Sequence, residues 1–322
     1  MASLLIIGGS GFFGKSILDA YQRGLLNSWG VDSICVLARN AVSLSTYFPE
    51  FINDSIKLIN GDIATCNALP FADYVIHAAA STDAANYLAR PEVEKKNIQA
   101  GTYNYCKLAE KFHRNSRIVY CSSGAVYGQQ PADLEYLSEE FDCGSVDEMS
   151  PVKRDYAAAK RDAERAIRTL GSQGGAVSIA RCFAFVGKYL PRDQHFAIGN
   201  FIQDGLMGRP INVKATIPVY RSYMYVDDLV HWLMTICHSA NPLCPIYNVG
   251  SDQAVTIGDL AELVAQKFTV DISKPELSQK SVDRYVPSIT KAKEVLGLQL
   301  SIDTAGAIDK TIAAIRMKNL RA

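Results

Sequence analysis

Short and almost continuous apolar runs alternate with longer amphipathic stretches through the first half of the chain. Helical periodicity covers Gly14–Leu26, Asn97–Phe112 and Tyr156–Leu170. The apolar runs between them predict strands at Ser3–Gly8, Ser33–Ala38, Ile56–Asn60, Tyr74–Ala78, Arg117–Ser122 and Val177–Cys182. Strands that are apolar along both faces are typical of a parallel sheet covered by helices on both sides. The alternation therefore predicts an α/β fold built on a Rossmann-type doubly wound parallel sheet.

The regular alternation of strand-like and helix-like segments ends after Arg181. The acidic segment Gln129–Pro151 predicts an exposed loop over a site. A short strand is expected at Pro210–Val213, and helices are expected at Asn200–Met207, Asp227–Ser239, Ile257–Lys267 and Thr304–Arg316. No repeat or linker separates the two parts. We therefore expect a first domain at 1–180, with part of 215–250, and a smaller interleaved C-terminal domain at 181–322.

Composition narrows the class of protein. Acidic and basic residues balance at 33 each, which argues against a nucleic-acid partner, because such proteins concentrate basic charge on one face. The eight cysteines contain no Cys-x-x-Cys pair and several lie inside apolar runs, which favours reduced thiols in a cytoplasmic protein. The apolar run at 4–7 is too short for a signal peptide, and no run is long enough to span a membrane.

Tyr156 and Lys160 lie four residues apart in the segment YAAAK. The alanines favour a helix, and this spacing places the phenol and the ammonium on one helical face. A phenol has a pKa near ~10 in model peptides, too high for proton exchange at neutral pH. A fixed cation beside it favours the phenolate and is expected to bring that pKa toward the working range. Any surface helix can carry such a pair, so its meaning depends on its surroundings.

A glycine loop follows the first predicted strand and opens the first helix. Glycines at this point allow a tight turn and a close approach of the backbone to a pyrophosphate, whose charge meets the helix N-terminus. A purely structural turn is the alternative. The loop predicts dinucleotide binding through Gly8, Ser10, Gly11, Phe12, Phe13 and Gly14.

The second predicted strand ends in Arg39-Asn40, without an acidic residue. An acid at this point binds the ribose 2′-hydroxyl of NAD, whereas an arginine suits the 2′-phosphate of NADP. A guanidinium can pair with a phosphate through two hydrogen bonds. A plain surface arginine is the alternative, but the missing acid still argues against NAD. NADP is the favoured cofactor.

The segment YCSSGAVYG at 120–128 leaves a buried strand with two hydroxyls at its C-terminal end. Ligands bind at this end of the strands in doubly wound sheets. Ser123 is therefore a candidate to polarise a substrate carbonyl, and a turn-capping serine is the alternative. Asp227 and Asp228 are adjacent acids at a predicted helix start, which capping and the helix dipole explain without a metal.

In combination, these motifs resemble those of the extended short-chain dehydrogenases/reductases of the nucleotide-sugar epimerase/dehydratase group. The resemblance covers nearly the whole chain. It also rests on GDI at 61–63, HAAA at 77–80, Arg181 followed by Gly187, and RSYMYVDD at 221–228.

The resemblance implies roles for individual residues. On the cofactor side, Asp62 and Ile63 would border the adenine, and Ala78, Ala79 and Ala80 would line the ribose. Ser123 would bond the reacting oxygen, Tyr156 would exchange its proton, and Lys160 would hold the nicotinamide ribose and tune Tyr156. On the substrate side, Arg221 and Arg284 would meet a diphosphate, and Asn200 would line the sugar-nucleotide site.

Departures from the family pattern narrow the subgroup. Gly124-Ala125 stands where the 4,6-dehydratases of the group carry an Asp-Glu pair, so no carboxylates are positioned for water elimination. Ala184 stands where many members have asparagine, which puts a hydrogen bond to the sugar in doubt. Arg39 departs from the epimerases, which generally keep NAD through an acidic residue.

The leading expectation is NADPH-dependent reduction of a 4-keto group on a nucleotide-diphospho-6-deoxyhexose, with a dTDP-linked sugar as one candidate, in deoxysugar or polysaccharide biosynthesis. The 6-deoxy detail rests on the subgroup resemblance only. A nucleotide-sugar 4-epimerase that keeps NAD(P) tightly bound is the first alternative. A catalytically silent dinucleotide-binding regulator is the second, and the intact set of Ser123, Tyr156 and Lys160 argues against it. The family resemblance also implies a homodimer.

Overall fold

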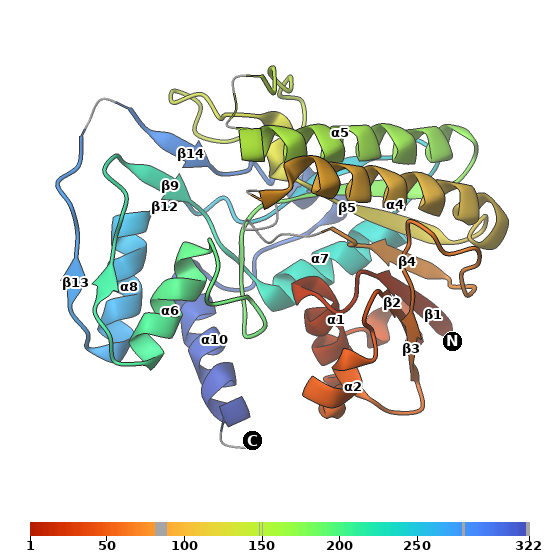
Figure 1. Cartoon of the computed structure of the whole chain (residues 1–322), viewed down its shortest axis with the longest axis horizontal. Helices are drawn as coiled ribbons and strands as arrows, with labels where there is room; N and C mark the ends of the chain where they lie inside the picture. Colours follow the sequence, from red (N-terminus) through yellow and green to blue (C-terminus); the bar gives the residue numbers. More distant parts are fainter. Residues whose placement is uncertain (81–88, 148, 150, 279–280, 320–322) are drawn as a thin grey trace. The chain divides into compact units, whose positions relative to one another are not determined.

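The computed structural model describes residues 1–80, 89–147, 149, 151–278 and 281–319 (Figure 1). The chain forms two compact units, each assembled from separate stretches of sequence. Unit 1 comprises Met1–Gly128, Cys143–Cys182 and Val230–Val249. Unit 2 comprises Gln129–Asp142, Phe183–Leu229 and Gly250–Ala322.

Unit 1 is built on one parallel sheet with the strand order β11-β6-β5-β4-β1-β2-β3. Most of its strands are apolar and buried along their length, as expected where helices cover both faces. The strands are β1 (Ala2–Ile7), β2 (Val31–Ala38), β3 (Ile56–Asn60), β4 (Tyr74–His77), β5 (Arg117–Ser123), β6 (Ala176–Cys182) and β11 (Ile246–Val249).

Helices lie on both faces of this sheet (Figure 1). On one face, α4 (Pro91–Phe112) and α5 (Pro151–Ser172) pack against each other and over a core that includes Tyr105, Ile118 and Ile179. On the other face lie α1 (Phe12–Gln22) and the part of α7 (Val226–His238) that belongs to unit 1. The Sγ atom of Cys237 on α7 contacts the Arg117 carbonyl of β5 at 3.1 Å. Between β2 and β3 lies the short helix α2 (Ser43–Tyr47).

Unit 2 combines helices with small sheets. Helices α6 (Ala197–Leu206) and α8 (Ile257–Phe268) pack closely against each other. Glycine at position 205 permits this contact, because a Cβ there would overlap the Phe268 ring. A three-stranded sheet has the order β12-β9-β14. Its strands are β9 (Val219–Arg221), β12 (Val255–Thr256) and β14 (Asp283–Tyr285). The remaining elements are β7 (Phe185–Val186), β8 (Ile211–Asn212), β10 (Met224–Tyr225), β13 (Ile272–Ser273), α9 (Thr290–Leu296) and α10 (Thr304–Asn319).

The predicted fold class is confirmed, and the six strands predicted for the first half lie within about two residues of their observed bounds. Several helices begin earlier than predicted, and the difference is largest for α4, which begins at Pro91, and α5, which begins at Pro151. Both have a proline at their start, a residue that fits the first helical position because its missing N–H has no partner there anyway. Strand β11 was not predicted, since a four-residue run is too short to separate from other apolar segments.

Candidate active site

The glycine loop between β1 and α1 is shaped by close backbone contacts. Gly8 has a φ of +86°, and a Cβ at this position would lie 2.7 Å from the Ala79 backbone. A Cβ on Gly14 would overlap the carbonyl group of Gly9. The loop therefore needs glycine at both positions, because a side chain at Gly8 would collide with the backbone that follows β4, and one at Gly14 would collide with the backbone of Gly9.

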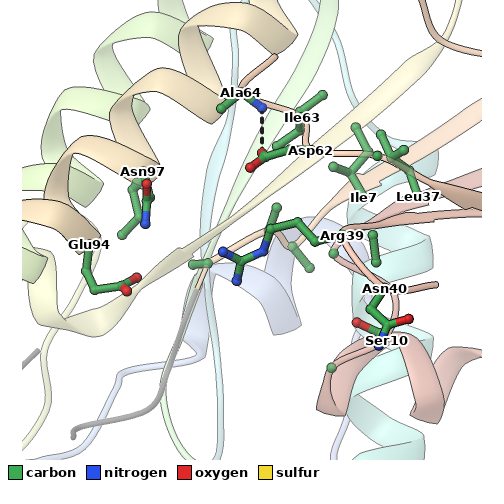
Figure 2. A pocket seen from close by; sticks show the side chains of 18 residues that line it. Ile7, Ser10, Leu37, Arg39, Asn40, Asp62, Ile63, Ala64, Glu94 and Asn97 are labelled. Carbon is green, nitrogen blue, oxygen red and sulfur yellow. Dashed lines mark hydrogen bonds between the residues drawn. The ribbon is translucent and has the colours of Figure 1, made fainter. Parts of the chain in front are cut away.

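A cavity of about 290 Å³ opens beside this loop, within unit 1 (Figure 2). Several residues predicted to bind the cofactor line it together, from the ends of β1 to β4. They are Gly8, Ser10, Gly11, Arg39, Asn40, Asp62, Ile63, Ala78, Ala79 and Ala80. Phe12, Phe13 and Gly14 belong to α1 and do not line the cavity. The arrangement suits a dinucleotide, and the role of each residue remains a prediction.

Arg39 extends into this cavity from the end of β2 (Figure 2). Asp62 also lines it, with Oδ1 accepting a hydrogen bond from the Ala64 amide at 2.9 Å. This bond fixes the turn after β3 and the orientation of the carboxylate. The cavity thus contains a cation at the end of β2, where a 2′-phosphate would need one.

Several lining residues of the same cavity were not predicted to bind the cofactor, among them Ala64, Glu94 and Asn97. Ala64 follows the predicted pair at 62–63, and Glu94 and Asn97 come from the first turns of α4 (Figure 2). Glu94 is buried. A sequence signal could have extended the predicted helix back to Glu94. Pro91 is followed by acidic residues, a pattern typical of a helix N-terminus.

The three predicted catalytic residues meet at the end of β5. Ser123 ends the strand and caps the short 3-10 helix η3 (Gly124–Tyr127), with Oγ accepting from the Ala125 amide at 3.2 Å. Its hydroxyl also hydrogen-bonds with Tyr156. The capping alternative is therefore realised, and one hydroxyl has the capacity for both of these contacts. The catalytic role of Ser123 stays a prediction.

Lys160 is held firmly beneath this pair. Its Nζ atom donates to the Cys121 carbonyl at 2.8 Å and to the Tyr120 hydroxyl at 3.3 Å, and it lies 5.9 Å from the centre of the Tyr156 ring. The Lys160 side chain is 2% exposed, whereas Tyr156 is half-buried. The ammonium is therefore held in place, whereas part of the Tyr156 side chain remains exposed.

The pKa of Tyr156 is raised from its ordinary value. Burial is the largest cause, and the nearby Lys160 ammonium and the hydrogen bond with Ser123 both act in the opposite direction without overcoming it. The expectation that Lys160 brings this pKa down toward neutrality is therefore not met in this structure. Instead the phenol stays protonated at neutral pH, as a proton donor must.

His77 ends β4 between the cavity and the catalytic residues. Its ring is buried and packs edge-on against Tyr105 at 4.9 Å between centroids. Neither ring nitrogen has a hydrogen-bond partner among the described residues. Burial, followed by the positive charge of Lys160, lowers the pKa of His77 to about 3, so the ring is neutral at pH 7.

The residues predicted to bind substrate lie in unit 2. Asn200 donates to the Gln194 carbonyl at 2.7 Å, and Arg221 pairs with Asp283 at 2.8 Å. The Arg284 guanidinium stacks over Tyr220 at 4.1 Å. In the pairing of β14 with β9, Arg284 stands opposite Tyr220, and Arg221 is the next residue along β9. Because successive side chains of a strand point to opposite faces, the two arginines lie on opposite faces of the small sheet. Binding one diphosphate from both faces would require their long side chains to reach around the sheet end.

Two negative findings concern the described part of the chain. No group of three or more His, Cys, Asp or Glu side chains there is arranged to hold a metal ion. No described helix combines the length and the apolar character needed to cross a bilayer.

Comparison with known proteins places this arrangement in a family. The model of the NAD dependent epimerase/dehydratase family matches residues 4–250, and the chain belongs to that family. Two curated relatives are UDP-glucuronic acid decarboxylases. UDP-glucuronic acid decarboxylase 5 from Arabidopsis thaliana is 30% identical to this chain, over 91% of this chain and 83% of its own length. UDP-glucuronic acid decarboxylase 1 from Xenopus tropicalis is 28% identical to this chain, over 97% of this chain and 72% of its own length.

Solved structures share the fold at lower identity. The UDP-glucose 4-epimerase of Thermotoga maritima has a TM-score of 0.79 and 19% identity, with 99% of each chain covered. A dTDP-glucose 4,6-dehydratase of Streptomyces venezuelae, solved with NAD bound, has a TM-score of 0.80 and 21% identity over 99% of this chain and 98% of that chain. These likenesses support the doubly wound fold.

Proposed function

We propose that this protein reduces the 4-keto group of a nucleoside-diphosphate 6-deoxyhexose with NADPH. The observation that carries the proposal is the arrangement of Ser123, Tyr156 and Lys160 at the end of β5, in the same unit as a cavity that contains Arg39. Unit 1 would hold the dinucleotide, and unit 2 would bind the nucleotide sugar.

Two features of the cavity support the binding of a dinucleotide. Gly8 and Gly14 keep the loop close to the strand ends, where a pyrophosphate would meet backbone amides and the N-terminus of α1. Arg39 would hold a 2′-phosphate through charge-assisted hydrogen bonds. A nicotinamide cofactor, when bound, supplies the hydride for reduction.

The protein's own groups would supply the proton and hold the carbonyl. Ser123 would donate a hydrogen bond to the carbonyl oxygen, which polarises the C=O bond. Tyr156 would transfer its phenolic proton to the same oxygen as the carbon gains hydride, so that C=O becomes CH–OH. Lys160 would stabilise the phenolate left on Tyr156 until solvent returns a proton. Tyr156 is protonated at neutral pH, as a donor must be, but its raised pKa makes it a weaker acid, so the transfer would depend on Lys160 and Ser123 stabilising the phenolate.

A substrate assay tests this function directly. Purified protein would be mixed with NADPH and a panel of nucleoside-diphospho-4-keto-6-deoxyhexoses, and the loss of NADPH absorbance would be followed. We expect one NADPH to be consumed for each 4-hydroxy sugar formed. Interconversion of two 4-hydroxy nucleotide sugars without added cofactor would replace the reductase by the 4-epimerase alternative.

Decarboxylation of a nucleotide-linked uronic acid is a second candidate, because the relatives cited above are UDP-glucuronic acid decarboxylases. It would oxidise C4, lose CO₂ from the adjacent carboxylate-bearing carbon and reduce C4 again, so no cofactor would be consumed. Incubation with UDP-glucuronic acid and a trace of NAD distinguishes the two functions. Release of CO₂ without a change in NADPH absorbance would favour the decarboxylase over the reductase.

A further inference from the structure

A row of polar residues crosses three neighbouring strands of the large sheet, close to their C-terminal ends. In the register of the sheet, Ser122 of β5 stands opposite Arg181 of β6, and Arg181 stands opposite Asn248 of β11. All three side chains are buried. Buried polar groups are costly unless they are hydrogen-bonded, so a polar row inside an otherwise apolar sheet needs partners.

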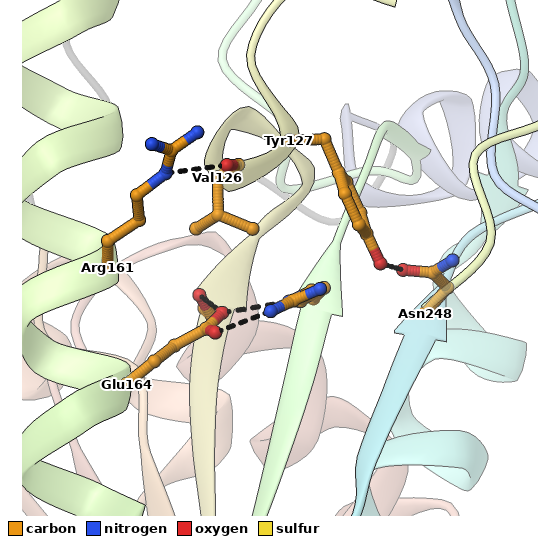
Figure 3. Close-up of polar contacts among 7 residues, drawn as sticks. Val126, Tyr127, Arg161, Glu164 and Asn248 are labelled. Carbon is orange, nitrogen blue, oxygen red and sulfur yellow. Dashed lines mark hydrogen bonds and ion pairs between the residues drawn. The ribbon is translucent and has the colours of Figure 1, made fainter. Parts of the chain in front are cut away.

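Glu164 on α5 provides the central partner (Figure 3). Its Oε1 atom accepts from the Ser122 hydroxyl at 2.5 Å and from Arg181 Nε at 3.0 Å, and its Oε2 atom accepts from an Arg181 terminal nitrogen at 2.8 Å. Glu164 and Arg181 are only 5% and 6% exposed. Burial lowers the pKa of Arg181, but the hydrogen bonds and charge of Glu164 outweigh this and keep the guanidinium charged.

The network continues to the far strand through an aromatic side chain. The Arg181 guanidinium lies over the Tyr127 ring at 4.7 Å, and the Tyr127 hydroxyl donates to Asn248 Oδ1 at 2.7 Å (Figure 3). Tyr127 belongs to η3, the turn that Ser123 caps. The polar row is thus tied both to α5 and to the turn that carries the serine.

Glu164 shares a helical face with the reacting groups. Tyr156, Lys160 and Glu164 follow one another at intervals of four residues, so they lie along one side of α5. Lys160 bonds the Cys121 carbonyl, and Glu164 bonds the hydroxyl of the next residue, Ser122. Two consecutive residues of β5 are therefore fixed to α5 immediately before Ser123.

Stability alone is a weak reason for such a pair. A buried ion pair loses so much hydration that apolar side chains of similar volume often stabilise a protein equally well or better. Its hydrogen bonds, however, demand one geometry, which apolar contacts do not. The bidentate contact between Glu164 and Arg181 therefore specifies the register of α5 on the sheet.

We propose that Glu164 and Arg181 are positioning residues that set the placement of Ser123 relative to Tyr156. This inference rests on the proposed function, which makes Ser123 and Tyr156 the groups that act on the substrate carbonyl. Neither Glu164 nor Arg181 would touch the substrate. Their effect passes through Ser122 on one side and through α5 on the other.

The test replaces the ion pair without leaving a buried charge, in the double variant Glu164→Leu/Arg181→Met. We expect folding and dinucleotide affinity to persist, while kcat falls about 10²-fold with little change in KM, as a misplacement of about 1 Å would produce. Arg165→Met is the matched control, because Arg165 lies on the same helix in an exposed pair with Asp162. It should leave kcat unchanged.

A second measurement does not depend on turnover. The phenol of Tyr156 would be titrated by ultraviolet difference absorbance, against a Tyr156→Phe background, in the wild type and in the double variant. Loss of alignment with Lys160 and Ser123 should move its titration to higher pH. An unchanged titration overturns the positioning role, even if no nucleotide sugar is ever turned over. Turnover failure in the wild type would instead reject the proposed function.

Ser122→Ala carries the test if the double variant does not fold. It removes one hydrogen bond and leaves the ion pair of Glu164 and Arg181 in place. A fall in kcat without a rise in KM, together with the upward shift of the Tyr156 titration, is again expected. Wild-type kinetics and titration in Ser122→Ala would overturn the proposal.

Discussion

The C-terminal edge of the large sheet is built in two different ways. At the ends of β1 to β4, glycine and alanine leave a cavity of about 290 Å³ beside the backbone. At the ends of β5, β6 and β11, the side chains of Ser122, Arg181 and Asn248 are buried and joined to neighbouring groups. The first half is suited to receive a ligand, and the second half is suited to hold the proposed reacting groups, Ser123 and Tyr156, in one position.

This difference predicts how each half fails. A substitution in the cavity half acts by filling space or by changing the charge that a ligand meets. A substitution in the other half acts by leaving a buried polar group without its partner, which costs roughly 1–3 kcal/mol for a neutral group and more for a charge.

Tyr156→Phe should have the largest effect. It deletes the proton donor and removes almost no contact area, so turnover should fall by about 10²–10⁴-fold. Dinucleotide affinity should stay near the wild-type value, because the cavity lies at the other half of the edge. Steady-state kinetics and calorimetric titration with NADPH measure the two quantities. A variant that keeps half of the wild-type kcat would show that another group is the acid.

The sequence predicted the parts of the structure that depend on local pattern. The first six strands were readable because each is a short apolar run between turn residues. The common face of Tyr156 and Lys160 followed from their spacing alone. The start of α4 was missed because its first turns are charged, so the apolar periodicity begins only later, and Glu94 was missed with it.

The sequence could not predict features that depend on burial or register. The pKa of Tyr156 moved upward because burial outweighs Lys160, and a sequence shows the neighbours of a residue along a helix but not its desolvation. The row of Ser122, Arg181 and Asn248 joins strands that are distant in the sequence. Their register is set by packing in three dimensions, and no local pattern contains it.

Acid should destabilise the protein through His77, which lies where the two halves meet. Its pKa is about 3 in the folded chain and about 6.5 in an unfolded one. Between these values only the unfolded chain binds the proton, so stability falls as pH falls below 6.5. His77 alone should contribute a slope of about 1.4 kcal/mol for each pH unit. His113 and His238, whose pKa values are also lowered by burial, add to it in the same direction.

Urea unfolding at pH 7, 6 and 5 measures this slope. His77→Leu removes the titrating group and should make the curve flatter than in the wild type. The exposed His231 serves as the control, since His231→Gln should retain the wild-type slope. Equal slopes in the wild type and His77→Leu would show that His77 does not titrate with the predicted pKa.

Arg39→Asp should weaken NADPH binding about 10–10²-fold, the contribution expected of a hydrogen bond between charged groups. The new carboxylate would also repel the 2′-phosphate, whereas NADH should be tolerated. Calorimetric titration with both cofactors measures the change. Arg114→Asp, an exposed position outside the cavity, is the control for net charge. Unchanged NADPH affinity in Arg39→Asp would mean that this arginine does not meet the phosphate.

Arg221→Ala should have the smallest effect on the fold. The N–O distance between Arg221 and Asp283 is 2.8 Å, the same as between Arg181 and Glu164. The side chains of Arg221 and Asp283, however, are 22% and 27% exposed. Water screens such a pair, so its loss should cost no more than about 1 kcal/mol of stability.

The same variant should raise KM for the nucleotide sugar and leave kcat nearly unchanged, because a diphosphate is held equally in the ground and transition states. Lys267→Ala is the matched control, since Lys267 forms a comparable 2.8 Å pair with Asp309 in the same unit. It should match Arg221→Ala in stability and the wild type in KM. If both variants keep the wild-type KM, Arg221 and Asp283 form an ordinary surface ion pair and Arg221 does not bind the diphosphate. Arg284 is then the remaining candidate.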